Sequence, residues 1–222
     1  MQVKVRATMA TVERYRARTR ATHWIHSAAF LALIVTGAII FVPAWGPIAA
    51  GGMTRFIHRI AAVLFVGIPL IYMVINWSAS WKGIKEAFTW TKDDLGWALA
   101  APAYYFTGNE EAMPPQEHMN TGQKLYWLLV IVTGVLFTIT GAIMWFTKDI
   151  AQGPLFRWSI FAHDVAFIVI FGMFLVHIYL SLVHPVMHGV WKSMLTGEVP
   201  AEYAKSHHGK WYERYIKEKR AS

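Results

Sequence analysis

The chain has 222 residues, of which 55% are hydrophobic and 15% aromatic, and it carries a formal net charge of +8. This apolar composition excludes an ordinary soluble domain and is typical of a small polytopic membrane protein. The lack of cysteine in the sequence excludes a Cys-ligated iron–sulfur cluster, a covalently attached c-type haem and disulfides within this chain. The positive charges stand beside apolar stretches, which favours control of membrane topology over nucleic-acid binding.

Four apolar stretches of about twenty residues occur along the chain, and each is long enough to cross a bilayer core. We expect membrane-spanning helices at about residues 24–45, 59–77, 125–146 and 159–184. A loop over residues 78–124 separates the second span from the third, and its aromatic residues predict an interfacial amphipathic segment. The sequence therefore predicts an all-α membrane protein, with a four-transmembrane-helix bundle as a single integral-membrane domain over residues 1–222.

The distribution of positive charge predicts the orientation of this bundle. Four spans place both termini on one side of the membrane. Of the 21 Lys and Arg residues, all but four lie in the N-terminal arm, in the loop or in the polar tail of residues 187–222; the four are Arg55, Arg59, Lys148 and Arg157. Because cytoplasmic segments carry the excess of Lys and Arg, we expect both termini, the loop and the tail to be cytoplasmic. The tail is expected to dock on a partner or to cover the cytoplasmic face.

Four of the histidines in or near the predicted spans lie at depths that allow them to pair. His163 and His177 are fourteen residues apart in the fourth span, so they share nearly the same helix face at a separation of roughly 21 Å along the axis, and cannot bind one metal ion together. The predicted orientation places His58 and His163 toward the outer side of the membrane, and His23 and His177 toward the inner side. These depths predict two bis-histidine haem b sites, each with ligands from two helices.

Other interpretations of these histidines stay open. A single His within a membrane span is usually a hydrogen-bonded packing or proton-relay residue. His26 stands one turn after His23 and competes with it as a ligand, whereas His184 and His188 lie closer to the headgroups than an inner haem. A haem-free membrane anchor or a metal-ion transporter is the alternative from a different class, although a transport site gathers its ligands at one midplane location.

Glycine and amide residues add to the candidate sites. Gly37 is fourteen residues after His23, so it falls at the level of the outer haem, where a small residue gives room to a porphyrin edge or allows close helix packing. Asn120 and Gln123 stand at the start of the third span, where their amides can hydrogen-bond the carbonyl groups of a quinone. Helix capping is the other interpretation, with Asn120 or Thr121 as the cap and Gln123 in the first turn.

Several segments of the chain together resemble one known family. They are ATHWIHSAAFLALIVTG, RFIHRIA, NTGQKLYW, FAHDVAF, FLVHIYL and GEVPAEYAKSHHGKWYERY. In this order they resemble the dihaem cytochrome b (gamma) subunit of membrane-bound formate dehydrogenase over nearly the whole chain. The histidine spacing is shared with cytochrome b subunits of hydrogenases and other quinone-linked oxidoreductases, whereas the loop and tail segments favour formate dehydrogenase.

The resemblance implies a multi-pass subunit of the bacterial inner (cell) membrane that holds two haems b. The implied iron ligands are His23, His58, His163 and His177. Electrons would enter at the outer haem from an iron–sulfur (beta) subunit, which receives them from a molybdenum or tungsten catalytic (alpha) subunit. This chain would therefore take part in the enzyme without carrying the formate-oxidising site.

The resemblance further implies that electrons leave from the inner haem to a quinone, either menaquinone or ubiquinone. The implied quinone pocket is lined by Asn120, Gly122 and Gln123 at the start of the third span. Membrane lipid would surround the chain, no nucleic acid would bind it, and the complex as a whole could form a higher oligomer.

Overall fold

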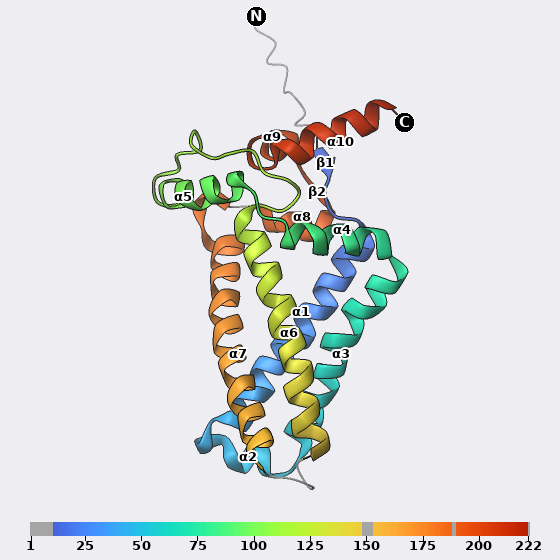
Figure 1. Cartoon of the computed structure of the whole chain (residues 1–222), viewed down its shortest axis with the longest axis vertical. Helices are drawn as coiled ribbons and strands as arrows, with labels where there is room; N and C mark the ends of the chain where they lie inside the picture. The colour runs from blue at the N-terminus through green and yellow to red at the C-terminus, as the bar shows by residue number, and fades with distance from the viewer. Residues whose placement is uncertain (1–10, 148–152, 188–189, 222) are drawn as a thin grey trace, which may run out of the picture. The chain divides into compact units, whose positions relative to one another are not determined.

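The structure is a computed structural model that describes residues 11–147, 153–187 and 190–221. The chain divides into two compact units. The first, which we call the α1–α3 unit, comprises residues 16–83. Among the described residues, the second comprises 11–15 together with 84–221, and we call it the α6–α7 unit. Figure 1 labels the elements of both.

Two long helices build the α1–α3 unit. Helix α1 spans Ala17–Phe41 and helix α3 spans Met53–Ile75, and a 3₁₀ turn (η1, Pro43–Trp45) and a short helix (α2, Gly46–Ala50) connect them. Pro43 ends α1, since a proline disfavours helical backbone at the residue before it and has no N–H to donate. Gly52 precedes α3 with a φ of 79°, a left-handed conformation that glycine adopts without steric cost. Helix α4, Trp77–Phe88, begins in this unit.

Helix α1 packs along α3 through aromatic and polar side chains. Phe30 stacks on Phe65 with ring centroids 5.9 Å apart, and the hydroxyl oxygens of Thr19 and Tyr72 are 2.9 Å apart. The outward faces of both helices are apolar: Val35 is 58% exposed and Val74 is 77% exposed. Apolar surface on this scale fits contact with lipid rather than with water.

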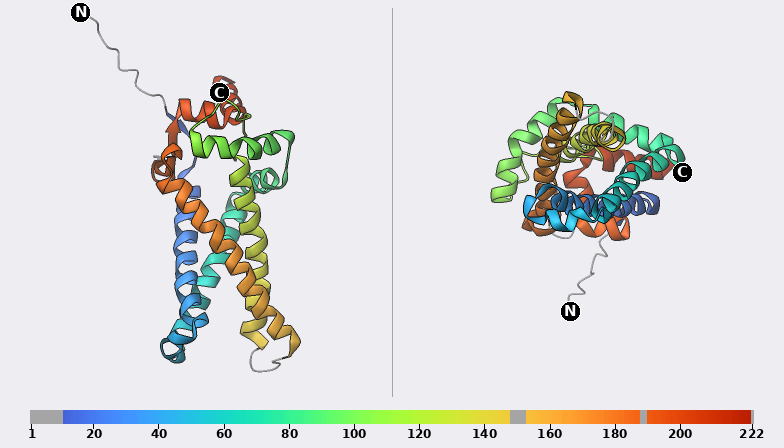
Figure 2. Two further views of the ribbon diagram at one scale, coloured as in Figure 1. Left: turned by 90° about the vertical axis from the view of Figure 1, so that its left-hand side faces the viewer. Right: turned by 90° about the horizontal axis from the view of Figure 1, so that it is seen from below.

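A second helix pair builds the membrane part of the α6–α7 unit. Helix α6 spans Thr121–Thr147 and packs against α7, which spans Pro154–Ile178, as Figure 2 shows from two further directions. Helix α7 continues as a turn of π-helix, η2, over Tyr179–Val183, and the helical path stops before Pro185. In this unit, too, the helices expose large apolar side chains, among them Ile139, Phe146 and Ile168.

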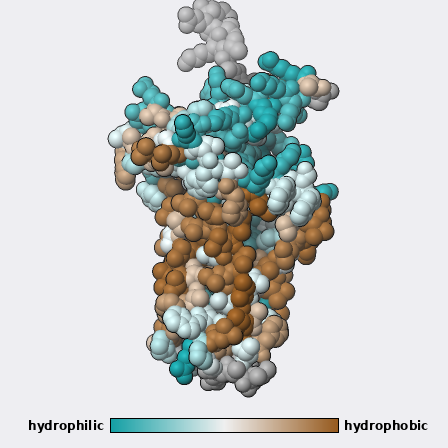
Figure 3. All heavy atoms as spheres, in the orientation of Figure 1, coloured by the Kyte–Doolittle hydropathy of each residue, from teal (hydrophilic) through white to brown (hydrophobic). Residues whose placement is uncertain are grey.

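The prediction of four membrane-spanning helices is confirmed. Helices α1, α3, α6 and α7 with η2 are long and apolar enough to cross a membrane, and Figure 3 shows hydrophobic residues along them. The chain is therefore an all-α membrane protein. The helices begin earlier than the predicted spans, α1 at Ala17 rather than near residue 24 and α3 at Met53 rather than near residue 59. The reason is that backbone hydrogen bonding continues into polar residues at a helix end, whereas hydropathy marks only the apolar part.

The segment over residues 78–124, which the sequence analysis described as a loop with an interfacial amphipathic segment, is largely helical. It holds most of α4 and the whole of α5, Lys92–Thr107. Helix α5 begins with a capping box, in which the Thr91 and Asp94 side chains exchange hydrogen bonds with each other's backbone N–H groups. Gly96 and Pro102 stand inside this helix, and because both residue types are poor helix formers, the sequence does not predict a helix here strongly.

The segments outside the membrane helices of the α6–α7 unit fold together. Strand β1 (Thr11–Glu13) pairs antiparallel with β2 (Glu198–Pro200), so the segment before the first membrane helix joins the segment after the last one. Val12, Val199 and Ala204 form a buried core against which aromatic residues of the tail pack. The remaining tail elements are η3 (Pro185–Met187), η4 (Val190–Lys192), α8 (Ser193–Thr196), α9 (Ala201–His207) and α10 (Gly209–Ala221).

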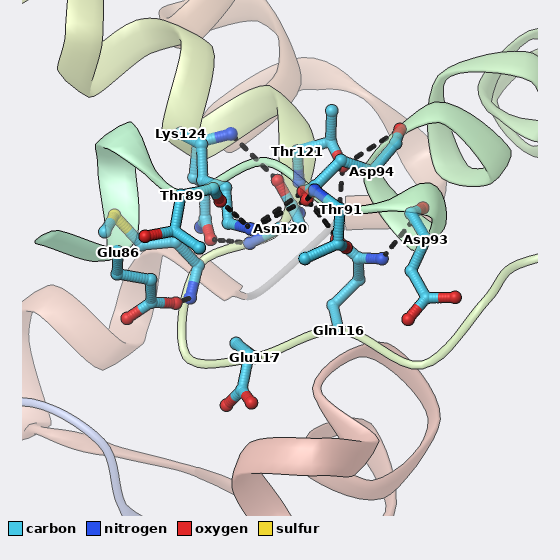
Figure 4. A network of polar contacts seen from close by, with 12 residues as sticks. Glu86, Thr89, Thr91, Asp93, Asp94, Gln116, Glu117, Asn120, Thr121 and Lys124 are labelled. Atoms are coloured by element: carbon cyan, nitrogen blue, oxygen red, sulfur yellow. Dashed lines mark hydrogen bonds and ion pairs between the residues drawn. The ribbon is translucent and has the colours of Figure 1, made fainter.

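A buried ion pair joins α5 to the start of α6 (Figure 4). Nζ of Lys124 lies 2.8 and 3.0 Å from the two carboxylate oxygens of Asp94, and both side chains are almost completely buried. The carboxylate also accepts hydrogen bonds from the Thr91 backbone N–H at 2.7 Å and the Thr121 hydroxyl at 3.0 Å. Burial alone would raise the pKa of Asp94, but the hydrogen bonds from Lys124, Thr91 and Thr121 hold this pKa below its ordinary value.

Removing one partner of this ion pair is expected to destabilise the α6–α7 unit. In Asp94→Asn or Lys124→Met the remaining group stays buried without its partner, which typically costs about 3–5 kcal/mol. The free energy of unfolding, measured by titration with a denaturing detergent, tests this. Asp93→Asn is the matched control, because it breaks an ion pair with Lys210 in which both side chains are 40% exposed, and it should cost about 1 kcal/mol or less. Equal losses at the two neighbouring aspartates would contradict this account.

Two histidines connect the loop before α6 to other segments: His208, which is fully buried, comes from the tail, and His118, which is half-buried, lies in the loop itself. Nδ1 of His208 lies 2.8 Å from the carbonyl oxygen of Glu117. Nε2 of His118 lies 3.4 Å from the carbonyl oxygen of Arg14. Burial, and then the nearby Arg14 guanidinium, lowers the pKa of His118 to about 4 and the pKa of His208 well below its ordinary value. Both imidazoles are therefore neutral in the folded protein at pH 7.

Acidification is expected to loosen the tail from the rest of the α6–α7 unit. Between the ordinary histidine pKa of 6.5 and the lowered value of about 4, the unfolded segment binds more protons than the folded one. Its stability is complete above pH about 6.5 and falls as the pH drops toward about 4. Hydrogen exchange of α9 and α10 at pH 7 and pH 5, corrected for intrinsic rates, measures this loss. His118→Gln removes one titrating group and should flatten the response, and equal protection at both pH values in the unmodified chain would refute the prediction.

Candidate functional site

His58 of α3 is held by two consecutive residues of α1. Its Nδ1 atom lies 2.8 Å from the Oγ1 atom of Thr36, whose side chain is buried. The edge of the imidazole lies over the next residue, since a Cβ atom added at Gly37 would be 3.5 Å from Cε1 of His58. Gly37, predicted from its distance to His23 to stand at the level of the outer haem, is thus beside the predicted outer ligand of its own unit.

The same arrangement occurs in the α6–α7 unit. Nδ1 of His163, on α7, lies 2.9 Å from Oγ1 of Thr140 on α6, and Thr140 is buried. A Cβ atom added at Gly141 would be 3.9 Å from Cε1 of His163. The ring of Phe137, one turn earlier on α6, lies 4.8 Å from the imidazole centroid. In both units a Thr–Gly pair of one membrane helix therefore receives an imidazole from the helix beside it.

The two predicted inner ligands have aromatic neighbours. His177 of α7 stacks on Tyr126 of α6, with ring centroids 4.7 Å apart and an interplanar angle of 4°. His23 lies in the second turn of α1, with Trp24 edge-on at 5.1 Å. The Nδ1 atom of His23 is buried, and it has no hydrogen-bond partner among the described residues.

The remaining histidines near the membrane helices lie in different surroundings. His26 stacks on Phe65 with centroids 4.1 Å apart. His184, which is buried beyond the end of η2, has Tyr105 and Tyr179 edge-on to its ring. His188 lies outside the described residues. His26 therefore packs against α3 of its own unit, which is the packing role that a lone histidine in a membrane span usually has.

These residues fit a haem better than a directly bound metal ion. A histidine that binds a metal through one ring nitrogen usually donates its other N–H to a protein acceptor, which fixes the ring. His58 and His163 both meet this requirement through Nδ1, which leaves Nε2 to bind iron. Within the described residues no group of three or more His, Cys, Asp or Glu side chains gathers as a metal site would.

Asn120 and Gln123 form a reciprocal cap at the start of α6. The Asn120 side-chain oxygen accepts from the Gln123 backbone N–H at 2.9 Å, and the Gln123 side-chain oxygen accepts from the Asn120 backbone N–H at 3.1 Å. This is the capping interpretation that the sequence left open, and it satisfies two backbone donors of the helix end. The Arg14 guanidinium also approaches the Gln123 oxygen, at 3.4 Å.

The capping hydrogen bonds use the side-chain oxygens of Asn120 and Gln123 and leave their NH₂ groups without a partner among the described residues. Only the oxygens of Asn120 and Gln123 take part in side-chain hydrogen bonds among the described residues, and neither NH₂ group is fully buried. Asn120 also lines a small pocket with Trp97, Tyr104, Tyr105 and other residues of the α6–α7 unit. Gly122 permits the close approach of Trp97, because a Cβ atom there would lie only 3.2 Å from Cη2 of that ring. Two amide donors thus stand at the helix start beside aromatic rings.

The structure adds Thr36 and Thr140 to the residues that the sequence analysis selected. A signal for them exists, since Thr–Gly dipeptides stand at 36–37 in the first span and at 133–134 and 140–141 in the third. The dipeptide alone is weak, because small residues are common where membrane helices pack. Only the structure shows that both threonines meet a histidine.

Comparison with known proteins supports a cytochrome. The profile of the family described as prokaryotic cytochrome b561 matches residues 14–197. The chain is 29% identical over 91% of its length to the formate dehydrogenase cytochrome b556 subunit of Haemophilus influenzae, and the match covers 83% of that protein. It is 26% identical to the formate dehydrogenase cytochrome b556(fdo) subunit of Escherichia coli K12, with 91% of this chain and 92% of that protein covered.

A further relative is the cytochrome b556(Fdn) subunit of the nitrate-inducible formate dehydrogenase of Escherichia coli K12. It is 27% identical, with 87% of this chain and 86% of that protein covered. The family profile extends over all four membrane helices and all four predicted histidine ligands. The chain therefore belongs to the prokaryotic cytochrome b561 family.

Proposed function

We propose that this chain is the membrane-anchoring dihaem cytochrome b subunit of a formate dehydrogenase, which passes electrons from an iron–sulfur subunit to a quinone near the cytoplasmic side. The printed names of the relatives support formate as the electron source, since they are cytochrome subunits of formate dehydrogenases. The chain lacks cysteine, so an iron–sulfur cluster would belong to a partner subunit, and the molybdenum or tungsten site would belong to a further, catalytic subunit. The charge bias supports cytoplasmic termini, and the four membrane helices together with the prokaryotic family support a location in the bacterial inner membrane.

One observation carries the haem assignment. In each unit an imidazole on an apolar helix is fixed through Nδ1 by a threonine of the neighbouring helix, with a glycine beside the ring. Membrane helices rarely contain ionisable side chains, and those present mark functional positions. Haem b supplies one-electron redox chemistry when bound. His58 and His163 would hold the outer haem, and His23 and His177 the inner one.

The quinone proposal depends on the amide donors at the start of α6. A quinone carbonyl needs a hydrogen-bond donor, and the NH₂ groups of Asn120 and Gln123 are available because their oxygens are engaged in capping. The capping bonds fix the orientation of both amides, so the donors are held in position. Gly122 lets the indole of Trp97 approach closely, which places an aromatic face near these donors.

Replacing single histidines tests the proposed ligand pairs. We expect His58→Ala and His163→Ala each to remove the same haem, and His23→Ala and His177→Ala each to remove the other. Each change removes one of the two histidines that would hold that haem. The measurements are haem counting and formate-reduced minus oxidised spectra of the purified complex, in which unmodified protein should show two b-type haems that formate reduces.

His26→Ala is the matched control for His23→Ala, because the two residues stand one turn apart on α1. It should keep both haems, since it removes contacts with Phe65 of α3 rather than a proposed iron ligand. Loss of a haem in His26→Ala but not in His23→Ala would reassign the inner ligand. Reduction of the haems by hydrogen and not by formate would point to a hydrogenase instead.

Two conservative substitutions separate quinone binding from helix capping. Asn120→Asp and Gln123→Glu keep the oxygen that accepts the capping hydrogen bond but lose the NH₂ donor. We expect the rate of quinone reduction at limiting quinone to fall roughly tenfold or more, the usual effect of losing a hydrogen bond to the reacting molecule. Haem content and thermal stability should be unchanged.

Asn109→Asp provides the control for the added negative charge. Asn109 is exposed in the same unit, and its oxygen accepts a comparable hydrogen bond from the Glu111 backbone N–H at 2.9 Å. This variant should reduce quinone like unmodified protein. Normal quinone kinetics in both Asn120→Asp and Gln123→Glu would show that these amides only cap α6.

A further inference from the structure

The hydrogen-bond geometry of Thr36 determines which way its contact with His58 runs. The Oγ1 atom of Thr36 lies 2.6 Å from the carbonyl oxygen of Ala32, one turn earlier on α1. A carbonyl oxygen can only accept, so the single hydroxyl proton of Thr36 points at Ala32. The contact with Nδ1 of His58 must then use a lone pair of the hydroxyl, and the proton in that bond comes from the imidazole.

Thr140 is arranged in the same way. Its Oγ1 atom lies 2.7 Å from the carbonyl oxygen of Leu136, so its hydroxyl also donates to its own helix and accepts from Nδ1 of His163. Both histidines therefore carry their proton on Nδ1, which leaves the lone pair of Nε2 directed away from the threonine. The two threonines thus select one tautomer and one ring orientation for both imidazoles.

The predicted inner ligand of α1 lacks this support. Nδ1 of His23 is buried and has no hydrogen-bond partner among the described residues. A hydrogen bond accepted from Nδ1–H makes the imidazole a stronger electron donor through Nε2. A stronger donor stabilises ferric relative to ferrous haem, and hydrogen bonding around the ligands is one of the means by which a protein sets the reduction potential of a haem.

We propose that Thr36 and Thr140 are positioning residues that orient both ligands of the outer haem and lower its reduction potential relative to the inner haem. The proposal rests on the proposed function, because it takes His58 and His163 as the two ligands of one haem. An outer haem of lower potential gives a downhill electron path from the outer side of the membrane toward the quinone. The threonines would therefore set the direction of transfer without touching iron.

Removal of each hydroxyl while the shape of the side chain is kept tests the proposal. In Thr36→Val and Thr140→Val of the purified complex, the midpoint potential of the lower-potential b haem should rise. We expect a shift of up to about tenfold in the one-electron reduction equilibrium for each threonine, which is up to about 59 mV. Potentiometric titration followed in the α band measures it, and the electron paramagnetic resonance of the ferric haem should change for the same component.

Thr133→Val is the matched control. Thr133 stands seven residues before Thr140 on α6, is equally buried, and donates the same kind of hydrogen bond to the Leu129 carbonyl oxygen at 2.6 Å. Its side chain has no histidine partner among the described residues. This variant should leave both potentials unchanged, and Thr36→Ser and Thr140→Ser should restore them because serine keeps the hydroxyl.

The outcomes separate this proposal from the proposed function. If unmodified complex contains two b haems and neither valine variant moves a potential or alters the resonance signal, the threonines do not tune the haem and the proposal fails alone. Loss of one haem in the valine variants with its retention in the serine variants would support positioning by the hydroxyl. Loss in both would refute a role for the hydroxyl. Unmodified complex without b-type haem would instead end the proposed function.

Discussion

A hydroxyl group that joins two membrane helices is the interaction on which the candidate haem site depends. Thr36 and Thr140 each donate to a carbonyl of their own helix and accept from a histidine of the next helix. In a region without water, an imidazole N–H that lost this acceptor would be left unpaired at a cost of a few kcal/mol. The bond therefore holds the ring in place and also holds α1 against α3, and α6 against α7, in one register.

The sequence predicted the membrane helices well because their signal is cumulative. A run of about twenty apolar residues identifies a span even where single residues depart from the pattern, so all four spans were predicted. The starts of α1 and α3 were not predicted, because a helix can begin several residues before the apolar run that hydropathy detects. The sequence analysis also did not predict α5 as a separate helix. Its start depends on the exchange between Thr91 and Asp94, and Asp94 is buried by an ion pair with Lys124, thirty residues away in the sequence.

The histidines illustrate a different limit of prediction. Their depths were predicted from the regular rise of a helix together with the orientation that the charge distribution predicts, and the pairing of His58 with His163 stays a prediction. Which group accepts the Nδ1–H depends on the rotation of one helix about its axis relative to the next, and the sequence does not specify this rotation. The capping pair at α6 is intermediate, since Asn120 and Gln123 match a known local pattern that predicts their oxygens' partners and leaves their NH₂ groups unassigned.

A side-chain amide whose oxygen caps a helix and whose NH₂ group binds a ligand is held rigid at the helix end. An exposed glutamine side chain normally samples several rotamers, and ordering it costs up to about 2 kcal/mol. At Gln123 the capping bond has already restricted the side chain, so a ligand that bonds the NH₂ group meets a preorganised donor. Asn120 gains in the same way, because its oxygen is fixed by the Gln123 backbone N–H.

Hydroxyl bonding to the preceding helical turn is common in this chain, so that bond alone does not make a threonine functional. Thr133, Thr138, Thr147, Ser159 and Ser181 all donate to the carbonyl oxygen four residues earlier. What distinguishes Thr36 and Thr140 is the combination of a glycine at the next position with a histidine on the facing helix. The glycine lets the ring come close enough for the hydroxyl lone pair to reach Nδ1, and the carbonyl bond fixes where that lone pair points. Neither feature would orient the imidazole by itself, and Thr133 with Gly134 shows the same dipeptide without a histidine partner among the described residues.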